Sequence, residues 1–155
     1  RALQDYTTKQ NNAAAISASL SVKQDFIAEG VERLKEENFK QKELINSLQA
    51  NILKNLAESL PAPSDSAHAI LFVEPMDDIA IRNLINDLVP KYSGYVGVFW
   101  GNDIDGYRYI IGSSTLDCRQ LATALREKFG AKGGGKAPMI QGNVVATKEE
   151  IKELL

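Results

Sequence analysis

The sequence predicts an α+β fold, in which a long helical hairpin or coiled-coil arm precedes a small βαββαβα globular domain. Two observations lead to this prediction. Apolar residues recur at helical spacing over residues 1–60, and short β-rich runs then alternate with helical segments over residues 68–155. The period changes at residues 61–67, a stretch rich in proline and small polar residues. We therefore expect three parts: an arm (1–60), a linker (61–67) and a globular domain (68–155).

The arm is expected to contain two helices. Residues 2–19 mix good helix formers with an alanine run, which favours a first helix. A second helix is predicted from Val22 to about Leu60, where two nearby prolines stop it. Ser21 and Gln24 have the spacing of a capping box, whose side chains would satisfy the first free N–H groups of that second helix.

The second helix carries a heptad seam that predicts self-association. Aliphatic residues occupy most of its a and d positions, and Asn38 and Gln41 interrupt its middle. A buried asparagine at an a position can fix the register and favour two strands, so we expect a homodimer. The predicted dimer seam consists of Ile27, Val31, Leu34, Asn38, Ile45, Leu48 and Ile52.

A second apolar face on this helix leaves another packing open. It would allow residues 2–19 and 22–60 to form an antiparallel pair within one chain, and both packings can occur together. The second face consists of Leu44, Leu53, Leu56 and Leu60.

The globular domain is expected to alternate strands and helices. Strands are expected at 68–73, 95–100, 107–111 and 139–146, with a hairpin joining the second to the third. Helices are expected from Asp77 or Asp78 through Val89, from Ser114 with Asp117 to Phe129, and from Thr147 with Glu150 onward.

Composition sets broad limits on function. The chain has 155 residues, of which 25% are charged and 44% hydrophobic, and its net charge is -2, so nucleic-acid binding would depend on a local basic patch. The single cysteine, Cys118, excludes an internal disulfide.

No run approaches the roughly 20 apolar residues of a membrane span, so we expect a cytoplasmic protein without a membrane partner. Because it starts at Arg1 without a methionine, we expect a piece of a longer protein.

Catalytic residues are scarce. His68 is the only histidine and lies at the start of a strand, where packing is its expected role. Cys118 lies in the first turn of a helix, whose dipole could lower its pKa, but a buried structural cysteine is the better interpretation. A zinc site needs about four ligands, which these two residues cannot supply. We predict no catalytic residue and no metal site, and a binding role is favoured.

The most unusual stretch is 130–142, which contains three consecutive glycines between Lys132 and Lys136. Residues 119–136 hold five cations and one acid, Glu127, a local charge of 5 − 1 = +4. A basic, glycine-rich loop suits a phosphate group. The alternative is an ordinary helix-to-strand connection in which Gly130 caps the helix. Nucleotide-binding P-loops and dinucleotide fingerprints are excluded, because here the helix precedes the glycines and the strand follows them.

Two groups of motifs resemble one family. A helix followed by Gly133-Gly134-Gly135-Lys136, Pro138-Met139 and Gln141-Gly142 resembles the DHH-associated domain that closes alanyl-tRNA synthetases and related editing proteins. Arg1-Ala2-Leu3, Asp5-Tyr6, Lys9 and Leu20-Ser21-Val22 are similar to the segment that follows the editing domain in freestanding alanyl-tRNA editing proteins. The chain departs from the family pattern in having three glycines rather than four and Ala137 between the lysine and the proline.

The resemblance implies a tRNA-binding and dimerisation module whose partner is tRNA, specifically tRNA(Ala). Zinc-dependent removal of mischarged amino acids, or ligation of alanine, would belong to the parent protein, so this chain itself needs no cofactor. The three glycines would offer backbone N–H groups and the two lysines would neutralise phosphates. Gln141 would bind a base edge or a ribose hydroxyl. Residue by residue, the implied nucleic-acid site is Lys132, Gly133, Gly134, Gly135, Lys136, Gln141, Arg119 and Arg126.

Two other functions stay open at this point. The same domain type occurs in DHH phosphoesterases, where its glycine loop would hold a substrate phosphate. Alternatively, the heptad arm is a purely structural oligomerisation module and the globular part binds nothing.

Overall fold

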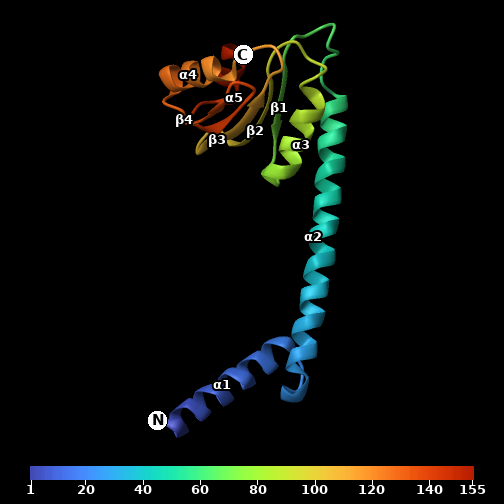
Figure 1. Cartoon of the computed structure of the whole chain (residues 1–155), viewed down its shortest axis with the longest axis vertical. Helices are drawn as coiled ribbons and strands as arrows, with labels where there is room; N and C mark the ends of the chain where they lie inside the picture. The colour runs from blue at the N-terminus through green and yellow to red at the C-terminus, as the bar shows by residue number, and fades with distance from the viewer. The chain divides into compact units, whose positions relative to one another are not determined.

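A computed structural model describes all residues from Arg1 to Leu155. It contains two compact units, Arg1–Ile45 and Asn46–Leu155. The division falls inside the longest helix (Figure 1), whereas the linker predicted from the sequence lies at residues 61–67. None of the helices combines the length and the apolar character that crossing a membrane requires.

The elements confirm the α+β class and most of the expected boundaries. The helices are α1 (Ala2–Leu20), the 3₁₀ helix η1 (Gln24–Phe26), α2 (Ile27–Glu58), α3 (Asp78–Leu88), α4 (Cys118–Phe129) and α5 (Lys148–Leu154). The strands are β1 (Ala69–Val73), β2 (Val96–Asn102), β3 (Gly106–Gly112), β4 (Lys132–Lys136) and β5 (Met139–Val144). The globular order is therefore βαββαββα, with one strand more than the sequence predicts, because the glycine run is itself a strand.

The five strands form one mixed sheet in the order β1-β2-β3-β5-β4. β1 and β2 are parallel, which requires a crossover, and α3 provides it. The other pairs are antiparallel, including the predicted β2–β3 hairpin. In the hairpin loop the side-chain oxygen of Asn102 accepts hydrogen bonds from the backbone N–H groups of Ile104 and Asp105.

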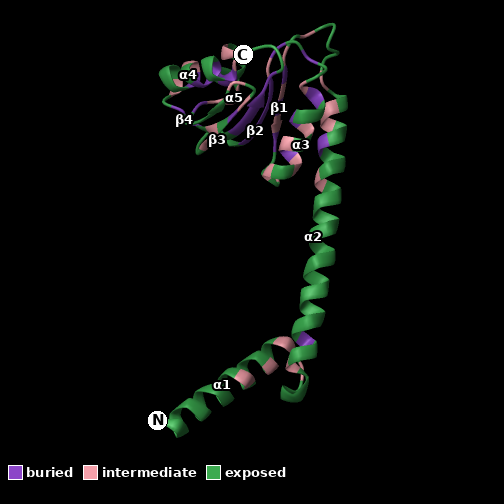
Figure 2. Cartoon of the chain, viewed as in Figure 1, coloured by how far each residue is buried: buried purple, intermediate pink, exposed green.

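Helices cover the two faces of the sheet unequally. On one face, α4 and α5 close a buried cluster that includes Phe99, Tyr109, Leu125 and Ile151. On the other face, α3 covers β2 and β3 through Ile81 and neighbouring apolar residues. Figure 2 shows β1, β2 and β3 largely buried between partly exposed helices. The outer strands β5 and β4 contact α4, so their opposite side, toward α3, is left open.

The C-terminal end of α2 packs on the α3 side of the globular unit. Leu53 is 2% exposed, and Leu56 and Leu60 pack against the same core. The Tyr92 hydroxyl donates a hydrogen bond of 2.7 Å to the carbonyl oxygen of Pro61, which ties the chain after the helix to the core. Three of the four residues of the predicted second apolar face therefore pack within the chain, while Leu44 is exposed.

In the unit Arg1–Ile45, two predictions about the helices are wrong. α1 buries none of its residues, so the antiparallel pair of residues 2–19 and 22–60 does not form. Ser21 does not cap the second helix: it ends α1 in the left-handed conformation, with φ 54 and ψ 39. The Ser17 hydroxyl donates to the carbonyl oxygen of Val22, which stabilises this turn. The long helix consequently begins at Ile27 instead of Val22.

Candidate functional site

The expected glycine loop is an edge strand. α4 ends at Phe129, and Gly130 caps it in the left-handed conformation with φ 65, as the alternative interpretation of this segment predicts. The chain then runs extended from Lys132 to Lys136 and pairs with β5. The prediction of a loop is wrong because three glycines carry no side-chain alternation from which a strand could be recognised.

The three glycines of β4 differ in the space around them. A Cβ atom on Gly133 would lie 2.3 Å from the carbonyl oxygen of Gln141, and one on Gly135 would lie 2.3 Å from that of Met139. Both positions therefore require glycine for close packing of β4 on β5. A Cβ atom on Gly134 would meet nothing within 4 Å. Gly134 is thus the position at which an outside group can approach the strand closely.

The strand register gathers polar side chains on the open side of β4 and β5. Paired residues of neighbouring strands share a face, so each row across the sheet lies on one side. One row on the α3 side, from β2 to β4, reads Trp100, Arg108, Asn143 and Lys132. The next rows are Val98, Ile110, Gln141 and Gly134, and then Val96, Gly112, Met139 and Lys136. Both lysines of the glycine strand and Gln141 therefore share this face.

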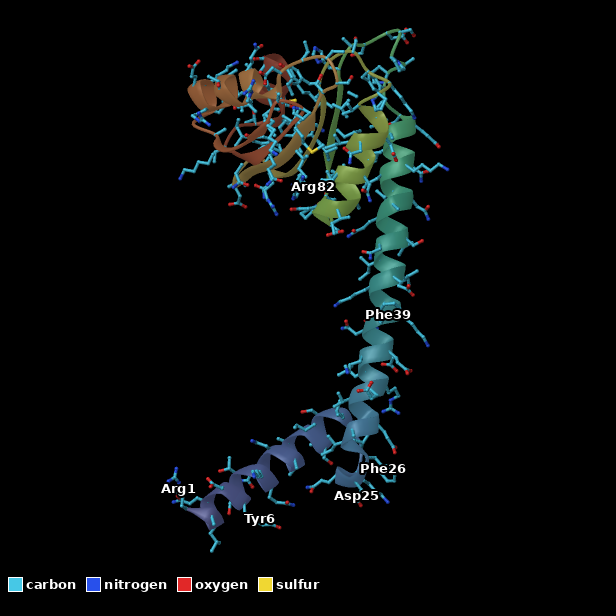
Figure 3. All side chains as sticks on the ribbon, viewed as in Figure 1. Arg1, Tyr6, Asp25, Phe26, Phe39 and Arg82 are labelled. Carbon is cyan, nitrogen blue, oxygen red and sulfur yellow. The ribbon has the colours of Figure 1, made fainter.

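α3 adds another basic side chain to this face. Arg82, labelled in Figure 3, extends from α3 to β5, where its guanidinium donates to Oε1 of Gln141 and approaches the Met139 sulfur at 3.8 Å. Arg108 pairs with Asp78 at 3.1 Å, and its guanidinium carbon lies 5.2 Å from the ring centroid of Trp100. The face thus holds Arg82, Arg108, Lys132 and Lys136 against the carboxylate of Asp78.

A groove of about 430 Å³ runs over the middle of this surface. Its volume is at the lower end of the range typical of small-ligand sites. Cationic side chains, amide groups and bare glycine backbone together match the chemistry of a phosphate or nucleotide ligand. The groove is lined chiefly by Asp78, Trp100, Arg108, Lys132, Gly134, Gln141 and Asn143. We call the whole surface, which comprises these groove residues together with Arg82 and Lys136, the open basic face.

Arg119 and Arg126 lie on α4, which covers the opposite side of the sheet. Arg119 forms a 2.6 Å ion pair with Asp117, the N-terminal cap of its own helix, and its hydrogen bond holds the pKa of that carboxyl below the usual range. Arg126 donates to the carbonyl oxygen of Gly133 at 3.4 Å. The local charge of +4 over residues 119–136 is therefore divided between the two sides of the sheet, and only Lys132 and Lys136 belong to the open basic face.

Other side chains with functional chemistry lie in the core or in local contacts. Phe99, Trp100, Tyr107 and Tyr109 are buried, so these aromatic side chains belong mainly to the core. His68 accepts a hydrogen bond at Nδ1 from the backbone N–H of Tyr95. Cys118 is fully buried, and burial raises the pKa of its thiol, with the charge of Asp117 adding to the effect. A raised pKa makes this cysteine a poor nucleophile.

Sequence reasoning missed Arg82, Arg108, Asp78 and Asn143. Arg108 could have been found, because it is the one charged residue in the apolar strand 107–111 and falls on the face opposite Tyr107 and Tyr109. Arg82 carries no such signal, since 59 residues separate it from Gln141. No group of three or more His, Cys, Asp or Glu side chains in the chain could hold a metal ion.

Comparisons with known proteins find relatives in structure only. No family model and no curated protein matches the sequence. Among solved structures, the C-Ala domain of Aquifex aeolicus alanyl-tRNA synthetase is similar at 20% identity and a TM-score of 0.45, over 57% of this chain and 89% of that one. RecJ of Thermus thermophilus, solved with Mg²⁺, is similar at 12% identity and a TM-score of 0.53, over 84% of this chain.

The chain spans only 20% of the RecJ chain. At such low identity the similarity to RecJ concerns the fold. The similarity to the C-Ala domain, at a TM-score of 0.45, supports no further statement about this chain.

Proposed function

We propose that the chain is a nucleic-acid-binding module whose ligand is tRNA and whose contact surface is the open basic face. The observation that carries this proposal is the meeting of four basic side chains, from α3, β3 and both ends of β4, beside backbone that Gly134 leaves uncovered. Phosphate contacts of this kind supply most sequence-independent affinity for nucleic acids. The overall charge of -2 would limit binding elsewhere on the molecule.

The resemblance refines this proposal. On this basis we propose that the ligand is tRNA(Ala) and that the protein is located in the cytoplasm. The resemblance also makes the chain the C-terminal part of an alanyl-tRNA editing protein or synthetase, with zinc chemistry in the parent and none here. Lys132 and Lys136 would neutralise phosphates, the free edge of β4 would offer the glycine N–H groups that do not pair with β5, and Gln141 would contact a base or ribose. Arg119 and Arg126 would contribute only if the nucleic acid also reaches α4.

The test is binding of the full chain to tRNA(Ala) and to an unrelated tRNA over a range of salt concentrations. Each neutralised phosphate releases counterions, so substituting Lys132→Gln with Lys136→Gln should lower affinity for both and reduce the salt slope by about 2. The matched control removes two lysines from α5, as Lys148→Gln with Lys152→Gln. Equal losses in both variants would show that only net charge matters, and an unchanged affinity of the first variant would refute the site.

We further propose that the heptad seam of α2 joins two copies. Leu34, Ile45 and Leu48 are each about half exposed, and such a row on one helix favours burial against a partner. Asn38 would fix the register of the pair, so Asn38→Leu should raise stability and loosen the choice of oligomeric state. Sedimentation of the full chain measures this. A monomer at high concentration would remove the dimer from the proposal and leave a structural oligomerisation role without support.

A second candidate function is favoured by the similarity of fold to RecJ, a DHH-family protein. In this alternative the open basic face holds the phosphate of a small substrate in a DHH-type phosphoesterase. Mononucleotides would then bind as tightly as tRNA, and the parent protein would release phosphate or a nucleoside monophosphate from small nucleotides. Affinity for tRNA far above that for a mononucleotide would exclude this alternative.

A further inference from the structure

Arg108 presents a planar cation on the open basic face, in contact with an indole ring and a carboxylate. Beneath it lies Trp100, which is 5% exposed and therefore fixed in the core. At its side the carboxylate of Asp78 accepts from Nη2 at 3.1 Å. The side chain of Arg108 nevertheless remains 59% exposed. One side of the guanidinium is thus occupied by the indole, and the rest is available to a ligand.

The groove continues from Arg108 across the sheet to the glycine strand. Arg108, Asn143 and Lys132 lie in one row on three adjacent strands, so the outer two backbones are about 10 Å apart. Long side chains at both ends make this a span that one nucleotide can bridge, with a base at one end and a phosphate at the other. Next to this row, Gly134 leaves the floor of the groove without a side chain.

Gln141 in the neighbouring row is oriented by α3. Arg82 donates to Oε1 of Gln141, so the carboxamide oxygen is already engaged. The amide nitrogen is left as the group that a ligand meets, and it can only donate. Because Asp78 is already paired with Arg108, the donors of Gln141 and Lys132 are the groups left for an acceptor-rich ligand, such as a phosphate, a ribose or a base carbonyl, and Arg108 offers a planar cation to a π-face.

We propose that this groove takes one unpaired nucleotide of a nucleic acid, with its base stacked on the guanidinium of Arg108 and its phosphate beside Lys132 and Gly134. The inference rests on the proposed nucleic-acid function and specifies the strand form that the site selects. A paired base cannot occupy the site, because both of its faces are already stacked in the duplex. Arginine planes and aromatic rings are the groups on which proteins stack unpaired bases.

The first experiment compares two RNAs with equal numbers of phosphates, a single-stranded oligoadenylate and a perfect duplex. Arg108→Lys keeps the charge and removes the plane. We expect this variant to lose about tenfold in affinity for the single strand and to stay within about twofold for the duplex. The control is Arg33→Lys on α2, an exposed arginine outside the groove, which should change neither affinity. Equal losses for both RNAs, or no loss for the single strand, would overturn the stacked base.

A second measurement reads the site directly. Trp100 is the only tryptophan, and its ring centroid lies 5.2 Å from the guanidinium carbon of Arg108, so its fluorescence reports on the indole beneath the proposed base. Oligoadenylate should change the Trp100 emission at saturation, whereas inorganic phosphate and the duplex should leave it unchanged. Gly134→Leu, which places a side chain in open space, should block the change even if Arg108→Lys folds poorly. An unchanged emission with bound oligoadenylate would overturn the proposal.

These outcomes distinguish a failure of the unpaired-nucleotide site from a failure of the nucleic-acid function. If the wild-type chain binds both RNAs equally and Arg108→Lys has no effect, only the unpaired-nucleotide site fails. If it binds neither RNA at any salt concentration, the nucleic-acid function itself fails.

Discussion

The two sides of the sheet at β5 are built from alternate residues of one short strand, yet they differ in every property that matters for function. Toward α4, Ile140 and Val144 are almost fully buried. Toward α3, Gln141 and Asn143 are exposed and border a groove with basic side chains. The α4 side of β5 is part of the core because a helix covers it, and the α3 side is a candidate binding face because no helix covers it there.

The largest effect that follows from this comparison concerns residues 140 and 141. Ile140→Ala should lower the free energy of unfolding by about 2–5 kcal/mol, because it leaves a cavity under α4. Gln141→Ala should stay within about 0.5 kcal/mol, since its side chain is exposed. Urea denaturation of both variants measures the difference. Similar losses would mean that the open basic face is also part of the core.

The glycines of β4 sharpen the comparison within one strand. Gly135→Ala should destabilise the protein by about 1–3 kcal/mol, because its Cβ atom would press against the backbone of Met139 and Ile140. Gly134→Ala should be neutral or slightly stabilising, because its Cβ atom meets no neighbour and alanine restricts the unfolded chain. Thermal melting of the pair provides the check. A larger loss at Gly134 would contradict the open position assigned to it.

Alkaline pH tests the covered side through Tyr107. Burial raises the pKa of Tyr107 from 10.0 to about 12, with its hydrogen bond to Asp103 adding to the effect. The folded state therefore retains the proton longer than the unfolded state, so this stabilisation is complete below pH 10 and is lost as the pH rises toward 12. Tyr107→Phe should weaken the loss of stability over this window. Denaturant midpoints measured against pH for both proteins test it, and identical slopes would exclude this role.

The smallest effect is expected on α4. Replacing Arg119 and Arg126 by glutamine should change the salt slope of tRNA binding by less than the Lys132 and Lys136 pair does, because the helix lies on the covered side. The exposed ion pair of Arg119 and Asp117 contributes little to stability, so the free energy of unfolding should hardly change. Salt titrations of both double variants provide the measurement. A larger slope change on α4 would move the interface to that side.

Much of the fold could be predicted from the sequence where side chains alternate or cap. Thr147 and Glu150 form the expected capping box, and the apolar runs of β1, β2 and β3 fall where their pattern indicates. β4 could not be predicted, because glycines have no side chains to alternate. The prediction that Ser21 caps the second helix was wrong for another reason. Serine and glutamine at capping-box spacing are also compatible with the C-terminal end of a helix, and the hydrogen bond from Ser17 to the Val22 carbonyl oxygen stabilises that end of α1.

The residues of the candidate site likewise fall into those that the sequence predicts and those that only the tertiary structure reveals. Lys132 and Lys136 were predicted because local composition marks them, and Gln141 because the resemblance implies it. Their separation from Arg119 and Arg126 depends on which side of β4 the preceding helix packs, which neighbouring residues do not specify. Arg82 and Asp78 reach the site only through the position of α3 over the sheet, a tertiary contact without any sequence signal.

The edge position of β4 has a consequence for solubility. An exposed strand with bare backbone is a template to which another strand can add. In an antiparallel pair of two copies centred on Gly134, Lys132 of each copy would face Lys136 of the other, and the like charges would repel. The two lysines thus also guard the edge against sheet growth, so variants that remove both should be kept dilute and checked for aggregation.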